Sequence, residues 1–200
     1  MAGARDARGA ASAPRKRPRV RIAVFCGSSR KSKEVFLAAA RGVGAEIARR
    51  GHTLIYGGGR TGLMGAVADA ALADGGRVLG VILREFIEQD VHHLGIDQLY
   101  AVEDMRSRKA GLDERADAFV ALPGGYGTLE ELTEILSFRK LGLHHRPLVL
   151  LNTAGFFDPL LAQIERAVEE GFDGPAARDY FCVTDDPRSA VDLCEAIKRD

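Results

Sequence analysis

Short apolar runs alternate with longer amphipathic stretches along most of the chain. Five runs of four to seven residues are apolar almost throughout, and most of them end at a glycine or a polar turn. Continuous apolar runs of this length indicate strands buried on both faces. The predicted strands are residues 20–26, 53–56, 78–83, 118–122 and 147–151, with 98–102 as a weaker sixth strand.

Between and after these runs, apolar residues recur at helical spacing. The predicted helices are residues 33–50, 63–74, 105–115, 129–141 and 158–170. Near the end of the chain we expect a loop at 171–178, a short edge strand at 180–184 and a last helix at 188–198. Strands that alternate with helices predict an α/β fold, a doubly wound parallel sheet with helices on both faces. No repeat or linker divides the chain, so residues 20–200 are expected to form a single domain.

Composition narrows the class of protein. Hydrophobic residues make up 46% and charged residues 28%, as in an ordinary globular protein. The 28 basic and 28 acidic residues balance, so no overall field favours nucleic acid or a membrane. Three cysteines without CxxC spacing suggest neither a disulfide framework nor a zinc site, and a cytoplasmic location is expected. No apolar run approaches the roughly 18 residues of a membrane span.

The first 19 residues form a basic tail that has no apolar stretch of the kind found in secretory signals. One interpretation of this tail is an arm that binds nucleic acid, and the other is a disordered, solvated segment. The tail is short and contains no aromatic residue, which favours the second interpretation. We therefore expect no nucleic-acid and no membrane partner.

Four segments of the chain follow predicted strands at the edge of the sheet where α/β proteins bind ligands. They are residues 27–29, 57–65, the segment that leads to Arg108, and 123–128. Within the first of these, Ser28 is expected to contact the ligand.

The segment 123–131, Pro-Gly-Gly-Tyr-Gly-Thr-Leu-Glu-Glu, lies between a predicted strand and a predicted helix. Glycines let the backbone approach a ligand closely, and the first turn of a helix presents free N–H groups and a positive dipole end. This combination predicts a site for a single phosphate. Gly127 stands where a Walker loop needs its lysine, so a triphosphate site is not expected. Alternatively, Thr128 and Glu131 have the spacing of a capping box, which would make them structural.

The segment 57–65 contains G-x-G-x-x-G at Gly57, Gly59 and Gly62. This pattern occurs in dinucleotide-binding turns, but those turns normally follow the first strand rather than the second. A turn that lets the chain pass close to a nucleotide is the favoured interpretation.

Three motifs in this order resemble those of the Lonely Guy (LOG) family of cytokinin riboside 5′-monophosphate phosphoribohydrolases. They are Gly57-Gly58-Gly59-x-x-Gly62-Leu63-Met64-Gly65, Met105-x-x-Arg108-Lys109 and Pro123-Gly124-Gly125-x-Gly127-Thr128-x-x-Glu131. The similarity runs from about residue 22 to residue 170 and includes the turn at 141–147. It implies a Rossmann-like fold, no metal, no cofactor, and a homo-oligomer, with a dimer as the expected state. Such sequences have also been described as lysine decarboxylases, but no lysine here is identified as a pyridoxal phosphate ligand.

The resemblance also implies roles for individual residues. Arg108 and Glu131 are the expected catalytic residues. Besides Ser28, the residues expected to bind substrate are Asp90, Lys109, Gly124, Gly125, Tyr126, Gly127, Thr128, Leu129, Glu130 and Ser137, of which Asp90 rests on the loosest alignment. Arg106 replaces a histidine that many family members have, which leaves the base preference open.

The implied reaction is hydrolysis of the N-glycosidic bond of a purine 5′-monophosphate, either a cytokinin riboside or an adenosine monophosphate. The products are the free base and ribose 5-phosphate, and the transition state resembles an oxocarbenium ion. We expect Glu131 to be ionised on the first helical turn, where it stabilises the cation and orients or deprotonates water. Arg108 cannot act as a base and is expected to hold Glu131 and substrate oxygens.

Other interpretations use the same residues. A non-catalytic carrier of a nucleotide or pterin-type cofactor would share the fold and the phosphate loop. Arg108 and Lys109 on their own would fit a solvated helical face. The histidine pairs at 92–93 and 144–145 are expected to be structural or on the surface rather than metal ligands.

Overall fold

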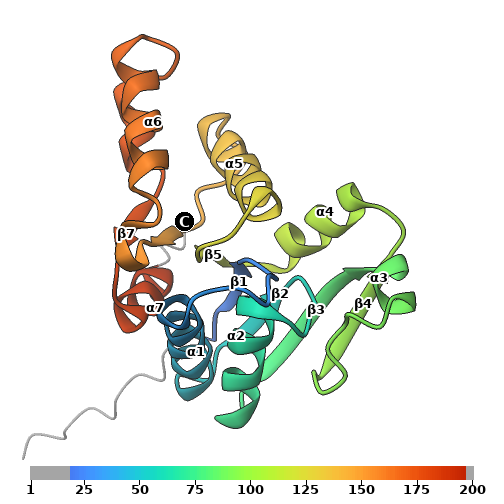
Figure 1. Ribbon diagram of the computed structural model, residues 1–200. Coiled ribbons are helices and arrows are strands. Elements are labelled where there is room, and N and C mark those ends of the chain that lie inside the picture. The colour runs from blue at the N-terminus through green and yellow to red at the C-terminus, as the bar shows by residue number, and fades with distance from the viewer. Residues whose placement is uncertain (1–18, 197–200) are drawn as a thin grey trace, which may run out of the picture.

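The computed structural model describes residues 19–196, so nearly all of the basic tail and the last four residues lie outside the described part. Seven strands form one parallel sheet in the order β4-β3-β2-β1-β5-β6-β7 (Figure 1). The strands are β1 (Arg21–Phe25), β2 (Thr53–Tyr56), β3 (Arg77–Leu83), β4 (Gln98–Val102), β5 (Ala118–Ala121), β6 (Leu148–Leu151) and β7 (Cys182–Thr184).

Helices connect the strands and cover both faces of the sheet. The α-helices are α1 (Glu34–Arg49), α2 (Gly62–Ala73), α3 (Arg84–Glu88), α4 (Met105–Arg115), α5 (Tyr126–Lys140), α6 (Asp158–Glu169) and α7 (Pro187–Glu195). Two short 3₁₀ helices, η1 (Thr153–Gly155) and η2 (Pro175–Asp179), lie near the last two strands.

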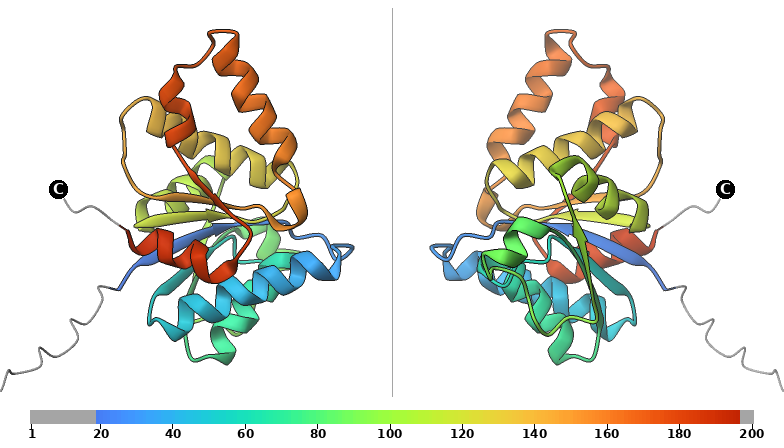
Figure 2. Two further views of the ribbon diagram at one scale, coloured as in Figure 1. Left: turned by 90° about the vertical axis from the view of Figure 1, so that its left-hand side faces the viewer. Right: turned by 90° about the vertical axis from the view of Figure 1, so that its right-hand side faces the viewer.

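The layers follow from side chains that alternate along apolar strands. In β1, Ile22 and Val24 belong to the core under α1, α2 and α7, whereas Ala23 and Phe25 belong to the core under α4 and α5. Figure 2 shows these two groups of helices on opposite sides of the sheet. Both faces of the central strands are therefore buried, as the continuous apolar runs predict.

The strand order reverses at β1, which pairs with β2 on one side and with β5 on the other. The connections that leave the carboxyl ends of β1 and β5 run to opposite faces, and a crevice opens between them. Ligands of doubly wound folds bind at such a crevice. The segment after β1 begins at Gly27 and the segment after β5 begins at Leu122.

The predicted doubly wound fold is confirmed, and all of the predicted strands are present within two residues of their expected ends. Three local predictions are wrong. The helix α3 is missing from the prediction because its five residues bury no side chain and so leave no apolar period. The helix α5 starts at Tyr126 instead of residue 129, because Gly125 already serves as its N-cap. The predicted loop at 171–178 contains η2.

None of the helices in the described part of the chain is long and apolar enough to cross a membrane. The three cysteines are free thiols: Cys26 and Cys194 are buried, and Cys182 is exposed.

Candidate active site

Arg108 on α4 and Glu131 on α5 form a buried ion pair near the crevice. Arg108 Nη1 donates to Glu131 Oε1 at 2.8 Å, and the two side chains are only 7% and 5% exposed. Taking a charge out of water is costly unless it is paired, so both residues have to be held by their surroundings. The sequence predicted these two residues as a functional pair, and the fold brings them into direct contact.

The guanidinium of Arg108 is fixed by two further contacts from the neighbouring strands. Its Nε donates to Val81 O at 3.2 Å and its Nη2 donates to Gly57 O at 3.4 Å. Gly57 allows this approach, because a Cβ atom at this position would overlap Nη2. The first glycine of the 57–65 segment thus makes room for the arginine.

The glycine loop after β5 leads directly into α5, whose N-cap is Gly125 and which therefore has no capping side chain. The N–H groups of the first turn have no partner within the helix, and they form the positive end of its dipole. Gly124 lies against the segment after β1, where a Cβ atom would be 2.8 Å from the Gly27 nitrogen. Gly27 in turn donates its N–H to Pro123 O at 3.1 Å. Glycine at 124 therefore permits close packing of the two loops at the crevice.

The capping-box interpretation of Thr128 and Glu131 is wrong. The helix begins before Thr128, which lies inside α5, and the Glu131 carboxylate accepts a hydrogen bond from Arg108. The expectation that Glu131 lies on the first helical turn is also wrong, because five helical residues precede it.

Burial dominates the electrostatics of Glu131. Desolvation raises the pKa of this carboxyl group above its ordinary value, and the charge and hydrogen bond of Arg108 act in the opposite direction. The sequence suggested that the helix N-terminus controls the ionisation of Glu131. Burial has the larger effect on its pKa. A carboxylate with a raised pKa is a better proton acceptor than an exposed one.

A cavity of about 530 Å³ is lined in part by Arg108 and Glu131. It is bounded by the segment after β1, the glycine loop and the first turns of α1, α2 and α5. Its lining residues are Cys26, Gly27, Ser28, Ser29, Lys31, Ser32, Lys33, Phe36, Leu63, Met64, Arg108, Pro123, Gly124, Gly125, Tyr126, Gly127, Thr128, Glu131 and Phe156. We call it the phosphate-loop cavity.

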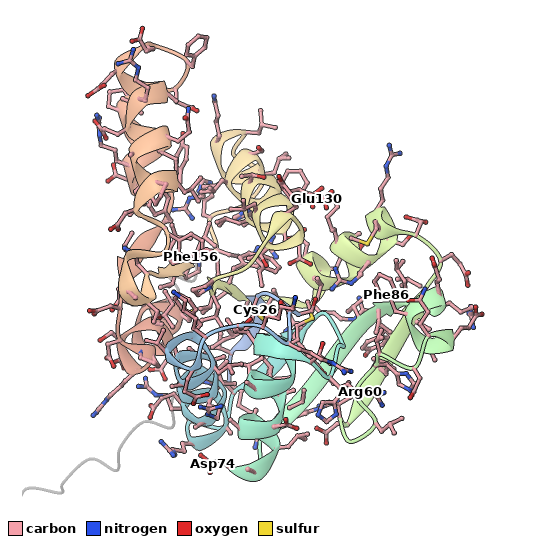
Figure 3. All side chains as sticks on the ribbon, in the orientation of Figure 1. Cys26, Arg60, Asp74, Phe86, Glu130 and Phe156 are labelled. Atoms are coloured by element: carbon pink, nitrogen blue, oxygen red, sulfur yellow. The ribbon has the colours of Figure 1, made fainter. Side chains whose placement is uncertain are left out.

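A second cavity of about 260 Å³ adjoins the first and shares Ser28, Met64 and Arg108 with it. Its remaining lining residues are Gly57, Gly59, Thr61, Ile82, Phe86, Gln89 and Val91. We call it the apolar cavity. Figure 3 shows Phe156, from the first cavity, and Phe86, from the second, on opposite sides of Cys26. Arg108 thus lines both cavities.

Most of the residues predicted to bind substrate line the phosphate-loop cavity. They are Ser28, Gly124, Gly125, Tyr126, Gly127 and Thr128, together with Arg108 and Glu131. Tyr126 stands at the rim, and its side chain is 94% exposed.

Four other predicted residues do not line the cavity and contact one another or their own helix. Lys109 Nζ forms ion pairs with Glu130 at 2.9 Å and with Glu134 at 3.2 Å. Leu129 follows the lining residues on α5 and donates its N–H to Gly125 O. Ser137 donates its hydroxyl to Thr133 O and lines a separate hollow between α5 and α6. Their assignment to substrate stays a prediction.

Asp90 lies outside both cavities, and its carboxylate accepts from Arg60 Nη2 at 2.9 Å. The pair is exposed and joins the segment after α3 to the segment after β2. Asp90 adopts a positive φ of 53° at this turn. In this structure its carboxylate contacts Arg60, while its neighbours Gln89 and Val91 line the second cavity, and its predicted contact with substrate stays a prediction.

Several lining residues were not singled out from the sequence. Lys31 and Lys33 come from the loop before α1, Phe36 comes from the first turn of α1, and Phe156 comes from the segment before α6. Phe36 and Phe156 pack edge to face with ring centroids 5.7 Å apart. The loop after a first strand is a ligand-binding position, which was the available signal for the two lysines. No pattern near Phe156 distinguishes it from core residues.

The start of α2 is closed to a phosphate. The N–H groups of Leu63 and Met64 donate to Gly27 O at 2.9 and 3.3 Å. A dinucleotide-binding turn would present these groups to its ligand. The glycines of this segment instead allow close packing, since a Cβ atom at Gly62 would lie 2.6 Å from the carbonyl carbon of Ser28.

Within residues 19–196, no group of three or more His, Cys, Asp or Glu side chains is arranged to hold a metal ion. Of the histidines expected to be structural, His144 is buried against Ile135 O at 3.1 Å, and His93 Nε2 lies 3.0 Å from Asp69 Oδ1.

Comparisons with known proteins identify the family of this chain. Residues 64–194 match a family model described as "Possible lysine decarboxylase". A cytokinin riboside 5′-monophosphate phosphoribohydrolase of Arabidopsis thaliana is 48% identical over 158 residues, which cover 79% of this chain and 73% of that enzyme. A probable enzyme of the same name from Oryza sativa subsp. japonica is 43% identical over 175 residues, covering 88% and 72%.

The chain belongs to the LOG family. The three motifs that resemble those of the LOG family contain the residues of the buried ion pair, the glycine loop and the glycine that accommodates Arg108. The LOG motifs thus converge on one place in the fold, the junction of the two cavities.

Solved structures with lower sequence identity share the fold of this LOG-family chain. A molybdenum cofactor binding protein from Rippkaea orientalis superposes with a TM-score of 0.69 at 21% identity, covering 90% of this chain and 97% of that one. The Moco carrier protein of Chlamydomonas reinhardtii gives a TM-score of 0.66 at 22% identity, covering 88% and 94%. At this identity the likeness establishes only the architecture.

Proposed function

We propose that this LOG-family chain hydrolyses the N-glycosidic bond of a purine nucleoside 5′-monophosphate and releases the free base and ribose 5-phosphate. The observation that carries the proposal is the 2.8 Å ion pair of Arg108 and Glu131 between the glycine loop and the apolar cavity. The names of the LOG relatives supply the substrate class.

The 5′-phosphate binds at the start of α5. The N–H groups of Tyr126, Gly127 and Thr128 lie in the first turn of a helix without a capping side chain, and all three residues line the cavity. The free N–H groups and the helix dipole at such a helix start favour binding of a phosphate. Because this contact is remote from the bond that breaks, it anchors the sugar for attack.

The anomeric carbon then lies next to Glu131. The oxygen of a water molecule forms a bond to C1′ while the C1′–N9 bond breaks and its electron pair leaves with the purine. Glu131 takes a proton from the attacking water, and the departing base gains one proton in return. The same carboxylate faces the positive charge that develops on the sugar, which stabilises the oxocarbenium-like transition state.

Arg108 positions Glu131 and does not take part as a base, because a guanidinium stays protonated at neutral pH. Its hydrogen bonds to Val81 O and Gly57 O fix the orientation of the guanidinium group. A carboxylate held in one rotamer acts on water from a defined direction, which is how a positioning contact contributes to rate.

The purine base extends past Arg108 into the apolar cavity. Ile82, Phe86 and Val91 supply apolar walls, and Gln89 provides an amide at the edge of the cavity. These walls are suited to a flat purine and to an apolar substituent on its N6 atom. An N6-prenylated nucleotide should therefore be a better substrate than AMP.

The test is to incubate the chain with AMP, isopentenyladenosine monophosphate and adenosine, and to separate the products by chromatography. We expect base and ribose 5-phosphate from both nucleotides in equal amounts, and far slower release from adenosine, which lacks the phosphate anchor. A chain that binds AMP but releases no base from either nucleotide would be a carrier, and the proposal would be wrong.

We also propose that the chain works as a homodimer in the cytosol. The family resemblance and the amphipathic helix α6 support the dimer: this helix projects from the body of the molecule in Figure 1 and buries none of its residues completely. The three free thiols support a reducing compartment. Light scattering coupled to gel filtration should give twice the 21.5 kDa chain mass, and a monomer at micromolar concentration would contradict the dimer.

A further inference from the structure

The loop between β1 and α1 forms the wall of the phosphate-loop cavity that faces solvent. It begins at Gly27, which is tied to the glycine loop through Pro123 O, and it ends at Lys33, the N-cap of α1. Ser28, Ser29, Lys31, Ser32 and Lys33 all line the cavity. This loop is therefore close to the start of α5, where the phosphate is proposed to bind.

Two serine hydroxyl groups of this loop form hydrogen bonds within the protein. Ser29 Oγ accepts from the N–H of Lys31 at 3.2 Å, and Ser32 Oγ donates to Ser29 O at 2.8 Å. Thr61 Oγ1 donates to Ser28 O at 2.8 Å and fixes the loop from the other side. These bonds hold the backbone around Lys31 and Lys33 in one conformation.

Among the residues that the structure describes, the two lysines have no ion-pair partner. Four lysines fall within residues 19–196, and two of them, Lys109 and Lys140, form ion pairs with carboxylates. Neither Lys31 nor Lys33 forms an ion pair in this part of the chain, although both residues line the cavity. An ammonium group without a partner beside a concave site attracts anions.

The charge of the cavity differs from that of the chain. The chain has a formal net charge of zero, whereas the cavity is lined by the cations Lys31, Lys33 and Arg108 and by the single carboxylate Glu131. Two positive charges therefore remain uncompensated. A phosphate monoester carries a charge of about −1.5 to −2 at pH 7, which would neutralise them.

We infer that Lys31 and Lys33 are binding residues for the 5′-phosphate: they recruit the dianion and hold it opposite the backbone amides of α5. This inference rests on the proposed function for the identity of the ligand. It assigns a role to two residues that neither the motifs nor the comparisons single out. Arg108 and Glu131 keep their roles at the sugar, so the lysines act on binding and on the rate of association rather than on the chemical step.

Arg30 provides a matched control. It precedes Lys31 in the same loop, is exposed and carries the same charge, but it does not line the cavity. Removing Arg30 changes the net charge of the loop as much as removing either lysine does. A difference between the variants therefore reports on position rather than on overall charge.

The experiment is calorimetric titration of AMP, ribose 5-phosphate and adenosine into the wild type, the single variants Lys31→Ala and Lys33→Ala, the double variant Lys31→Ala/Lys33→Ala, and Arg30→Ala, which matches each single variant in charge. We expect the double variant to bind AMP and ribose 5-phosphate about tenfold more weakly, as two partly exposed charge contacts allow, and adenosine as well as the wild type does. Arg30→Ala should stay within about twofold. Because the Debye length falls from about 30 Å to about 8 Å between 0.01 and 0.15 M salt, the difference should shrink as salt is added.

Either of two results would overturn the inference: unchanged binding of AMP and ribose 5-phosphate by the double variant, or an equal loss in Arg30→Ala. A wild type that binds no ribose 5-phosphate would also overturn it. Failure of the proposed function would give a different result. The lysine variants would still bind AMP more weakly than the wild type, but the wild type would not hydrolyse AMP.

Discussion

The guanidinium group of Arg108 occupies space that only a glycine at position 57 leaves free. Its Nη2 donates to Gly57 O, and a Cβ atom at residue 57 would overlap that same nitrogen. A glycine 51 positions away in the sequence thus decides whether Arg108 can face Glu131.

Replacing Gly57 with alanine should therefore impair catalysis without unfolding the chain. The atom displaced is the far end of a flexible side chain, so the backbone can stay in place while the guanidinium moves. A displacement of about 1 Å in a catalytic group can cost about 100-fold in rate, and we expect a loss of this order in kcat. Gly174→Ala is the control, since nothing lies within 4 Å of a Cβ atom there. Equal kcat values for Gly57→Ala and the wild type would mean that the position of Arg108 does not matter.

The Arg108–Glu131 pair should be more important for function than for stability. Breaking a buried ion pair leaves one charge without a partner and typically costs about 3–5 kcal/mol, whereas replacing both partners with apolar residues is often neutral. We expect Arg108→Met and Glu131→Leu each to lower the free energy of unfolding by about 3 kcal/mol, and the double variant to recover most of that loss. Urea unfolding measures all three. Losses that simply add up in the double variant would show that the two side chains are not coupled.

The pH dependence of kcat/KM should report on Glu131. Burial raises the pKa of this carboxyl group, and the proposed base is its deprotonated form. Activity should therefore fall as the pH is lowered through the raised pKa, so the acid limb should have its midpoint above the ordinary carboxyl value of 4.5. A profile that stays flat down to pH 4.5 would exclude a buried carboxylate as the base.

The three thiols should react very differently with a disulfide reagent. Burial raises the pKa of Cys26, and it raises the pKa of Cys194 to about 12, whereas Cys182 is exposed. Because the thiolate is the reactive form, we expect one thiol per chain to react quickly in the native state and all three in urea. Cys182→Ala should abolish the fast reaction. Fast modification of Cys26 would mean that the floor of the phosphate-loop cavity is open to the reagent.

The sequence was informative where a pattern has one physical meaning. Runs such as 118–122 are apolar at every position, and only a strand buried on both faces requires this. The glycine loop and the Arg108–Glu131 pair could be predicted because motifs of a known family mark them. The contact of the two charged residues across 23 positions then follows from the order of the strands.

Other features depend on tertiary contacts that leave no local trace. The start of α5 was placed three residues late because Thr128 and Glu131 have the spacing of a cap, while the actual N-cap is a glycine. The same error put Glu131 on the first turn and gave the helix dipole too large a role. Phe156 reaches the cavity only because the segment before α6 folds back against Phe36. The pairing of Asp90 with Arg60 likewise joins two segments 30 residues apart.

The most direct test of the account is to separate binding from turnover in Glu131→Gln. The amide keeps the shape of the side chain but cannot accept a proton from water, so we expect kcat for base release to fall by about 1,000-fold, with the Kd for AMP within about threefold of the wild type. Glu103→Gln, which alters an exposed carboxylate paired with Arg84, serves as the control and should keep full activity. Base release by Glu131→Gln at the rate of the wild type would contradict the central claim that this carboxylate acts at the anomeric carbon.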